Sequence, residues 1–161
     1  MEFLHTERLV LRTLEKSDAP VIHRYRNDSQ CARYQRWDET SLPAMEQLVI
    51  DHEKDVFLSE APQQRYGIAL GDHLIGDLAY FYTEGDCVTL GITVAPAAQR
   101  KGYAFEILSA VLPAIQEKYP ALETVALIDP ENTASIRLFE KLGFVRDCYA
   151  ESIRSLVYIL K

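Results

Sequence analysis

One short stretch of the chain combines two basic residues, a glycine and a small residue in an order suited to holding an anion. It follows an apolar run and precedes a strongly amphipathic one, so we expect a strand, a compact loop and a helix. The first N–H groups of a helix lack partners and carry partial positive charge, which makes such a turn a cradle for a diphosphate. A glycine there lets the backbone approach the anion closely, whereas a larger side chain would obstruct that approach. The stretch reads Gln99-Arg100-Lys101-Gly102-Tyr103-Ala104.

A second group of side chains recurs at helical spacing further along the chain. Asn132, Ser135 and Phe139 are three and four positions apart, which places them on one face of a helix. Each has an alternative interpretation, since Asn132 is suited to capping that helix and Phe139 to filling a core. The first stretch alone is also weak evidence, because ordinary strand-to-helix turns can hold a glycine and two basic residues. Together the two motifs predict a ligand site at two strand-to-helix crossovers.

The surrounding pattern predicts the elements that must position these motifs. Alternating or β-branched apolar runs indicate strands, Gly-Asp turns join the three central strands, and apolar residues at helical spacing indicate helices. The expected fold is α+β, a single domain over residues 1–161 with a central, mixed, mostly antiparallel twisted sheet of about seven strands and about four flanking helices. The expected strands are 8–14, 65–70, 74–83, 87–94, 124–128, 145–149 and 154–160, and the expected helices are 17–27, 43–58, 104–119 and 132–142.

Composition and charge limit the classes of function. The chain has 161 residues, 48% hydrophobic and 25% charged, with a net charge of −7. These values fit one soluble domain with a sizeable core and argue against a nucleic-acid partner. Cys31, Cys87 and Cys148 form no C-x-x-C pair, so we expect buried free thiols and no metal site. No long apolar segment is present, so we expect a cytoplasmic protein without a membrane span.

The two motifs, in this order and spacing, resemble the cofactor motifs of the GNAT superfamily of N-acetyltransferases. The opening Thr6-Glu-Arg-Leu-Val-Leu-Arg12 is similar to the start of the RimJ/RimL branch, which acetylates protein N-termini. The resemblance implies acetyl-CoA as co-substrate, bound in a V where the sheet splays after the third central strand. The pantetheine arm would pair with the backbone of that strand at Ile92, Thr93 and Val94.

The resemblance assigns further roles around this V. The backbone of residues 100–104 would bind the diphosphate, Asn132 would contact the pantetheine, and Phe139 would lie beside the sulfur. A neutral amine would attack the thioester directly and the thiolate would leave. Many relatives protonate the sulfur from a tyrosine where this chain has Phe139, so Ser135 is the candidate acid, with an ordinary helix hydroxyl as the alternative. Leu90 stands where many relatives have a glutamate base; the base is unassigned, with Asp77, Glu84 and Asp86 as candidates.

The acceptor site is expected to be built from the segment that joins the first two helices and from the final hairpin. Aromatic faces attract amines, so candidates for the wall of this site are the aromatic residues Tyr34, Trp37, Tyr80, Tyr82 and Tyr149, with core packing as the alternative. Of these, Trp37, Tyr80 and Tyr82 are predicted to bind the acceptor. The predicted function is transfer of an acetyl group to the N-terminal amine of a protein or peptide. Acetylation of a small amine such as a polyamine, amino acid or aminoglycoside is left open, as are a non-catalytic acetyl-CoA-binding module and a homodimer.

Overall fold

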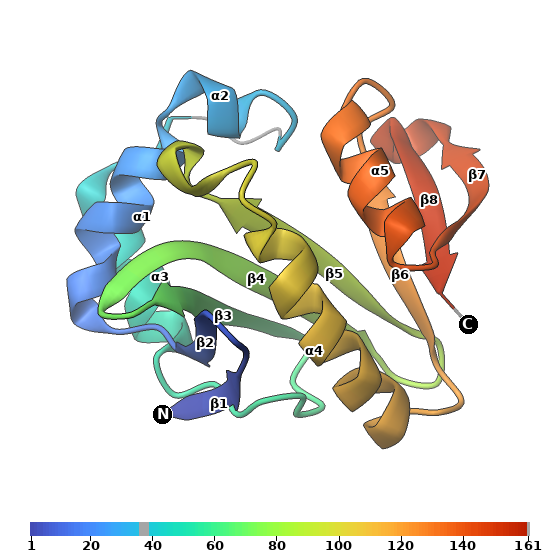
Figure 1. Cartoon of the computed structure of the whole chain (residues 1–161), viewed down its shortest axis with the longest axis horizontal. Coiled ribbons are helices and arrows are strands. Elements are labelled where there is room, and N and C mark those ends of the chain that lie inside the picture. Colours follow the sequence, from blue (N-terminus) through green and yellow to red (C-terminus); the bar gives the residue numbers. More distant parts are fainter. Residues whose placement is uncertain (36–38, 161) are drawn as a thin grey trace.

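The described residues, 1–35 and 39–160 of the computed structural model, contain one open eight-stranded sheet with the order β1-β2-β3-β4-β5-β6-β8-β7 (Figure 1). Neighbouring strands run antiparallel except β5 and β6, which are parallel. The strands are β1 (Glu2–His5), β2 (Leu9–Thr13), β3 (Gln63–Leu70), β4 (His73–Thr83), β5 (Cys87–Val94), β6 (Glu123–Ile128), β7 (Val145–Ala150) and β8 (Ser155–Leu160).

Five α-helices accompany the sheet within the described ranges. They are α1 (Ala19–Arg26), α2 (Ser29–Ala32), α3 (Leu42–His52), α4 (Tyr103–Lys118) and α5 (Thr133–Lys141), with 3-10 turns at Lys16–Asp18, Pro96–Ala98 and Glu151–Ile153. The predicted α+β architecture is confirmed. Strand β1 and helix α2 add to the expected elements, and each has only four residues, too few to show a period in the sequence. Helix α3 ends earlier than expected, where the Nδ1 atom of His52 lies 2.7 Å from the Oδ2 atom of Asp55.

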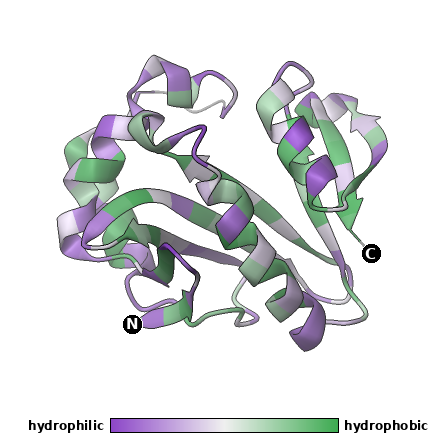
Figure 2. Ribbon diagram, in the orientation of Figure 1, coloured by the Kyte–Doolittle hydropathy of each residue, from purple (hydrophilic) through white to green (hydrophobic). Residues whose placement is uncertain are grey.

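Two apolar clusters hold these layers together. Helix α4 buries Leu108, Val111 and Ile115 against residues of the central strands, including Tyr66 and Leu78. A second cluster joins α1 and α3 to β4, and its members are Leu14, Ala19, Ile22, Tyr25, Cys31, Met45, Val49 and Leu74. In Figure 2 hydrophobic residues accordingly follow the strands, while hydrophilic residues alternate along the outer surfaces of the helices. Val88 and Leu90 of β5 belong to the first cluster, so packing fixes this strand as a scaffold for the loop that follows it.

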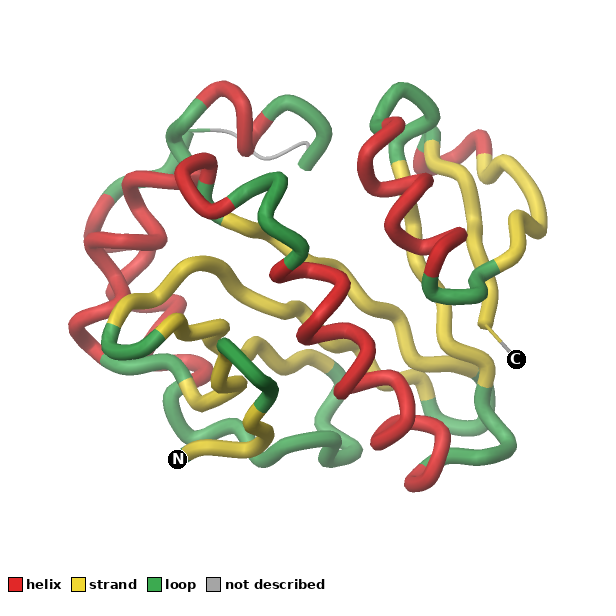
Figure 3. The backbone as a smooth tube through the Cα atoms, in the orientation of Figure 1, coloured by secondary structure: helices red, strands yellow, loops and turns green. Residues whose placement is uncertain are grey.

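The sheet splits between β5 and β6. The parallel register runs from Cys87 opposite Glu123 to Leu90 opposite Ala126. Beyond Leu90 the two strands diverge, and in Figures 1 and 3 they form the arms of a V that opens toward α2 and the start of α5. Strand β5 stays paired with β4 up to Val94, opposite Gly76. A Cβ atom on Gly76 would lie 2.2 Å from the carbonyl oxygen of Thr93, so only glycine permits this approach.

Candidate functional site

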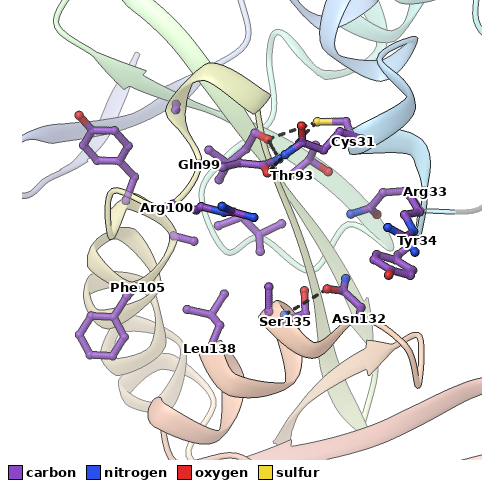
Figure 4. A pocket seen from close by; sticks show the side chains of 18 of the residues that line it. Cys31, Arg33, Tyr34, Thr93, Gln99, Arg100, Phe105, Asn132, Ser135 and Leu138 are labelled. Atoms are coloured by element: carbon purple, nitrogen blue, oxygen red, sulfur yellow. Dashed lines mark hydrogen bonds between the residues drawn. The ribbon is translucent and has the colours of Figure 1, made fainter.

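A cavity of about 460 Å³ lies at the mouth of the V. Its walls come from four segments: the end of β5, the loop and first turn of α4, the first turns of α5, and α2 with the residues after it (Figure 4). The cavity brings together ten of the predicted cofactor residues, from both motifs. These are Ile92, Thr93, Val94, Gln99, Arg100, Gly102, Tyr103, Ala104, Asn132 and Ser135.

The loop before α4 has an unusual backbone. Arg100 (φ 63°) and Gly102 (φ 80°) both adopt the left-handed conformation, and the helix begins at Tyr103 without a side-chain cap. The first helical N–H groups have no partner within the helix. Lys101 between them does not have a positive φ, so the sign of φ alternates along the loop, a pattern typical of anion-binding concavities formed by successive N–H groups. The loop, drawn green ahead of the red α4 in Figure 3, therefore has the geometry expected of an anion cradle.

Gly102 contributes to this loop in another way than its sequence position suggests. A Cβ atom added to Gly102 would lie 3.5 Å from the Nη2 atom of Arg8. The new side chain would thus start toward Arg8, and its contact would be an ordinary van der Waals one. The reason for glycine here is its positive φ, which L-residues adopt only at a cost.

Gln99 fixes the start of the loop through its side chain. Its Nε2 atom donates to the carbonyl oxygen of Val94 at 2.9 Å, and its Oε1 atom accepts from the Nε2 atom of Gln30 at 3.0 Å. The Cys31 thiol also donates to the Val94 carbonyl, at 3.3 Å. The Gln99 side chain therefore links the end of β5 to α2. Its amide contributes to the site by holding this part of the cavity wall in place.

Helix α5 contributes the opposite wall. The Oδ1 atom of Asn132 accepts from the backbone N–H of Ser135 at 3.2 Å, so Asn132 is the helix cap and still lines the cavity. Phe139 lies outside the lining, because it is buried and packs edge-on against Phe144 with ring centroids 5.0 Å apart. Leu138 takes the place at the cavity that the sequence reasoning gave to Phe139 (Figure 4). Adjacent residues on a helix point about 100° apart, so Leu138 faces the cavity while Phe139 faces the core.

Two of the predicted acceptor residues, Tyr80 and Tyr82, lie away from this cavity. Tyr80 is fully buried in the main core, where burial raises the pKa of its hydroxyl. Tyr82 stands opposite Val88, near the other end of β5, and packs on Tyr119. Trp37 lies outside the described residues, and Lys101 is outside the cavity lining. Two lining residues stand beside Asn132 in Figure 4: Tyr34, which was predicted as part of the acceptor wall, and Arg33, which the sequence did not single out.

The titratable groups at the cavity are few. Its described lining carries two arginines, Arg33 and Arg100, and no carboxylate. Burial, with smaller contributions from Asp28 and Asp77, raises the pKa of the Cys31 thiol to about 11, so this thiol is neutral at pH 7. A neutral thiol is a poor nucleophile.

The carboxylates considered as bases lie elsewhere. Asp77 is buried and accepts hydrogen bonds from the Tyr25 hydroxyl and from Nη1 of Arg65. Glu84 and Asp86 belong to the β4–β5 turn, at the opposite end of β5 from the cavity. None of these three is among the residues that line the cavity. The described lining therefore offers no carboxylate to accept a proton directly.

Other structural findings bear on the sequence expectations. The cysteines are all free, but only Cys31 is buried, while Cys148 is exposed, so the expected burial of all thiols is wrong. Cys148 lies on the edge strand β7, whose residues are mostly solvent-exposed. The described residues contain no group of three or more His, Cys, Asp or Glu side chains suited to a metal ion. Nor do they include a helix long and apolar enough to cross a membrane.

Fold and cavity together define an acyl-CoA-dependent transferase of the class suggested by the two motifs. Residues 8–145 match the family model of the acetyltransferase (GNAT) domain, and the chain belongs to this family. It is 27% identical to the uncharacterized N-acetyltransferase p20 of Bacillus licheniformis, over 91% of this chain and 84% of that protein. It is 26% identical to the uncharacterized N-acetyltransferase YnaD of Bacillus subtilis, over 88% and 82% of the two chains.

Solved structures share the fold over nearly the whole chain. A GNAT-family acetyltransferase from Bacillus anthracis has 23% identity and a TM-score of 0.82, covering 99% of this chain and 98% of its own. RimL, described as a ribosomal L7/L12 α-N-protein acetyltransferase in complex with coenzyme A, has 16% identity and a TM-score of 0.82, covering 99% and 97%. Spermidine N-acetyltransferase from Vibrio cholerae, in complex with CoA and spermine, has 21% identity and a TM-score of 0.77, covering 94% and 93%. The neighbours thus include enzymes named for quite different amine acceptors.

Proposed function

We propose that this protein transfers the acetyl group of acetyl-CoA to the N-terminal amine of a protein or peptide, within the cavity at the mouth of the V. The observation that supports the proposal is the pair of left-handed residues ahead of α4, a backbone geometry typical of anion-binding loops, at the wall of that cavity. Backbone groups of residues 100–104 would hold the diphosphate, and Arg100 would add positive charge.

The thioester arm would follow the free edge of β5. The backbone of this strand has no β6 register partner beyond Leu90, so its backbone groups around Ile92 are open to a ligand on that side, whereas the Val94 carbonyl already accepts from Gln99 and Cys31. An extended arm bearing amide groups can pair with such an edge as an added strand does. This placement leads the sulfur into the V, between β5 and the start of α5, where Ser135 lies.

The chemical step would then need little from side chains. The amine nitrogen forms a bond to the acetyl carbon, the carbon–sulfur bond breaks, and the sulfur leaves as a thiolate or takes a proton. Ser135 is the hydroxyl that we assign as proton donor to the sulfur, because it lines the cavity on the first turn of α5. The amine proton leaves through solvent, since the described lining holds no carboxylate. Proximity of the bound reactants supplies most of the rate enhancement.

The charge of the cavity supports an N-terminal amine over a polyamine. A polyamine carries several positive charges and would need carboxylates, whereas the described lining has only Arg33 and Arg100 as charged groups. Like charges held close together repel. A peptide N-terminus places one amine in the cavity and leaves its remaining residues outside.

An acceptor screen tests this function. Purified protein, acetyl-CoA and a panel of N-terminal peptides, free amino acids, aminoglycosides and spermidine are compared by the release of free thiol. We expect release with peptides and at most background with spermidine. Ser135→Ala should lower kcat at least tenfold without changing the KM for acetyl-CoA, and Ser109→Ala is the matched control, because its hydroxyl only donates to the Phe105 carbonyl of its own helix. CoA binding without thiol release for any amine would favour a non-catalytic binding module.

A further inference from the structure

A cluster of polar contacts joins the N-terminal segment to the first turn of α4, some 100 residues later in the chain. The carboxylate of Glu106 receives three hydrogen bonds: from the Thr6 hydroxyl, from the backbone N–H of Arg8 at 2.9 Å, and from the Nε atom of Arg8 at 2.7 Å. We call Thr6, Arg8 and Glu106 the N-terminal clamp. Partial burial opposes the charged carboxylate, but the bonds from Thr6 and Arg8 outweigh it and lower the pKa of Glu106. The Glu106 carboxylate is therefore ionised at neutral pH.

Arg8 reaches past Glu106 to the cofactor loop itself. Its Nη1 atom donates to the carbonyl oxygen of Lys101 at 3.1 Å. Its guanidinium carbon lies 4.5 Å from the ring centroid of Tyr103, which is a cation–π contact. Its Nη2 atom faces the α-carbon of Gly102, as the position of an added Cβ atom shows. One guanidinium thus contacts three consecutive loop residues.

Arg8 makes these contacts from outside the cavity lining. Gly102 and Tyr103 line the cavity, whereas Arg8 does not. Binding of the Lys101 carbonyl by Arg8 also keeps that oxygen, which carries negative partial charge, directed to the clamp. The Lys101 carbonyl oxygen is thus occupied by Arg8 and does not compete with an anion for the N–H groups of the loop.

The loop needs such support because its backbone is strained. A non-glycine residue in the left-handed region costs about 1–2 kcal/mol, and Arg100 is one. The residues 100–102 are also exposed, so their own packing supplies little restraint. Strained conformations persist only when their surroundings fix them. Arg8 is the charged side chain that the structure places against this loop from outside.

We propose that Arg8, held by Glu106, is a positioning residue for the co-substrate: it braces the loop of residues 100–103 so that its N–H groups point to the diphosphate. The inference rests on the proposed placement of acetyl-CoA. It also gives the Thr6–Arg12 opening a role in the structure, because Thr6 and Arg8 are the partners of Glu106. Lysine would not serve equally, because it lacks the planar fork that contacts Glu106 and the Lys101 carbonyl at once.

The test compares two arginines of the same N-terminal segment. Arg8→Gln removes the contacts of Arg8 with the loop. Arg12→Gln is the control: it breaks a similarly close ion pair, from Nη1 of Arg12 to Oδ2 of Asp18 at 2.8 Å, and this pair does not contact the loop. Calorimetry with CoA measures affinity, and urea unfolding measures stability. We expect the Kd for CoA to rise about tenfold in Arg8→Gln, equivalent to 1.4 kcal/mol, and to stay within twofold in Arg12→Gln even where stability falls.

A truncated donor separates positioning of the diphosphate from general damage. S-acetylpantetheine has the thioester arm without the diphosphate, so its kcat/KM should be equal for wild type and Arg8→Gln, while that for acetyl-CoA falls about tenfold. Glu106→Gln should shift the same measurements in the same direction, and it provides a second test should Arg8→Gln fail to fold. Unchanged CoA affinity, or equal loss with both donors, would overturn the proposal. Failure of the wild type to bind CoA would instead refute the proposed co-substrate site.

Discussion

Substitution of Gly102 by alanine tests the anion cradle at its most constrained point. Gly102 has φ 80°, and an alanine Cβ atom would make only an ordinary contact with Arg8. The cost is thus conformational, about 1–2 kcal/mol for an L-residue in the left-handed region. Because the loop is exposed, it can relax in the free protein, and ligand binding must then restore the strained form. With tenfold in affinity per 1.4 kcal/mol, we expect the Kd for CoA to rise about 5- to 30-fold.

Gly85 provides the matched control for this experiment. It lies in the β4–β5 turn with φ 71°, and an added Cβ atom would meet nothing within 4 Å. Gly85→Ala thus carries the same backbone cost at the other end of β5, and we expect it to lower stability without changing CoA affinity. Gly102→Asn should be milder than Gly102→Ala, since asparagine tolerates the left-handed conformation better. Equal CoA affinity in wild type and Gly102→Ala, measured by calorimetry, would refute the cradle.

Three further predictions follow from charged and buried groups. Arg33→Glu should allow acetylation of spermidine and raise the KM for peptides with acidic residues near the N-terminus, measured by thiol release; no change in preference would remove Arg33 from the acceptor site. Asp77→Asn should destabilise the protein by about 3–5 kcal/mol in urea unfolding, because it leaves Arg65 buried without its charged partner; a loss under 1 kcal/mol would contradict this. Cys31, with its pKa raised to about 11, should react with a thiol reagent at pH 8 far more slowly than exposed Cys148, and mass spectrometry of the modified peptides reports the order.

Local signals in the sequence predicted much of the cofactor side. The cap at Asn132 depends on a few adjacent residues, and the structure shows the capping role that the sequence offered as an alternative. The loop before α4 was likewise visible, because a glycine between an apolar strand and an amphipathic helix marks a turn whatever surrounds it. Fold class followed from the order of such elements.

Features that depend on distant packing were not predictable in the same way. Phe139 and Leu138 differ by one position, and only the seating of α5 on the sheet decides which one faces the cavity. Tyr80 was predicted to bind the acceptor, but the face of β4 that carries it is covered by α4. The contact of Arg8 with Glu106 spans 98 positions in the chain, and no local pattern links the two residues. The Thr6–Arg12 opening was the one available signal.

Because β5 and β6 separate beyond Leu90, two strands in the middle of the sheet each have an unpaired edge there, in addition to the edge strands β1 and β7. Such an edge offers unpaired peptide groups, which natural sheets usually cover. Any thioester arm that pairs there would join the β1–β5 half of the molecule to the β6–β8 half, so the two halves should resist unfolding together once it is bound. At a ligand concentration 100-fold above Kd, linkage alone adds about 2.7 kcal/mol to the unfolding free energy. Hydrogen exchange should slow on both arms of the V at once, which makes the parted strands a direct reporter of co-substrate binding.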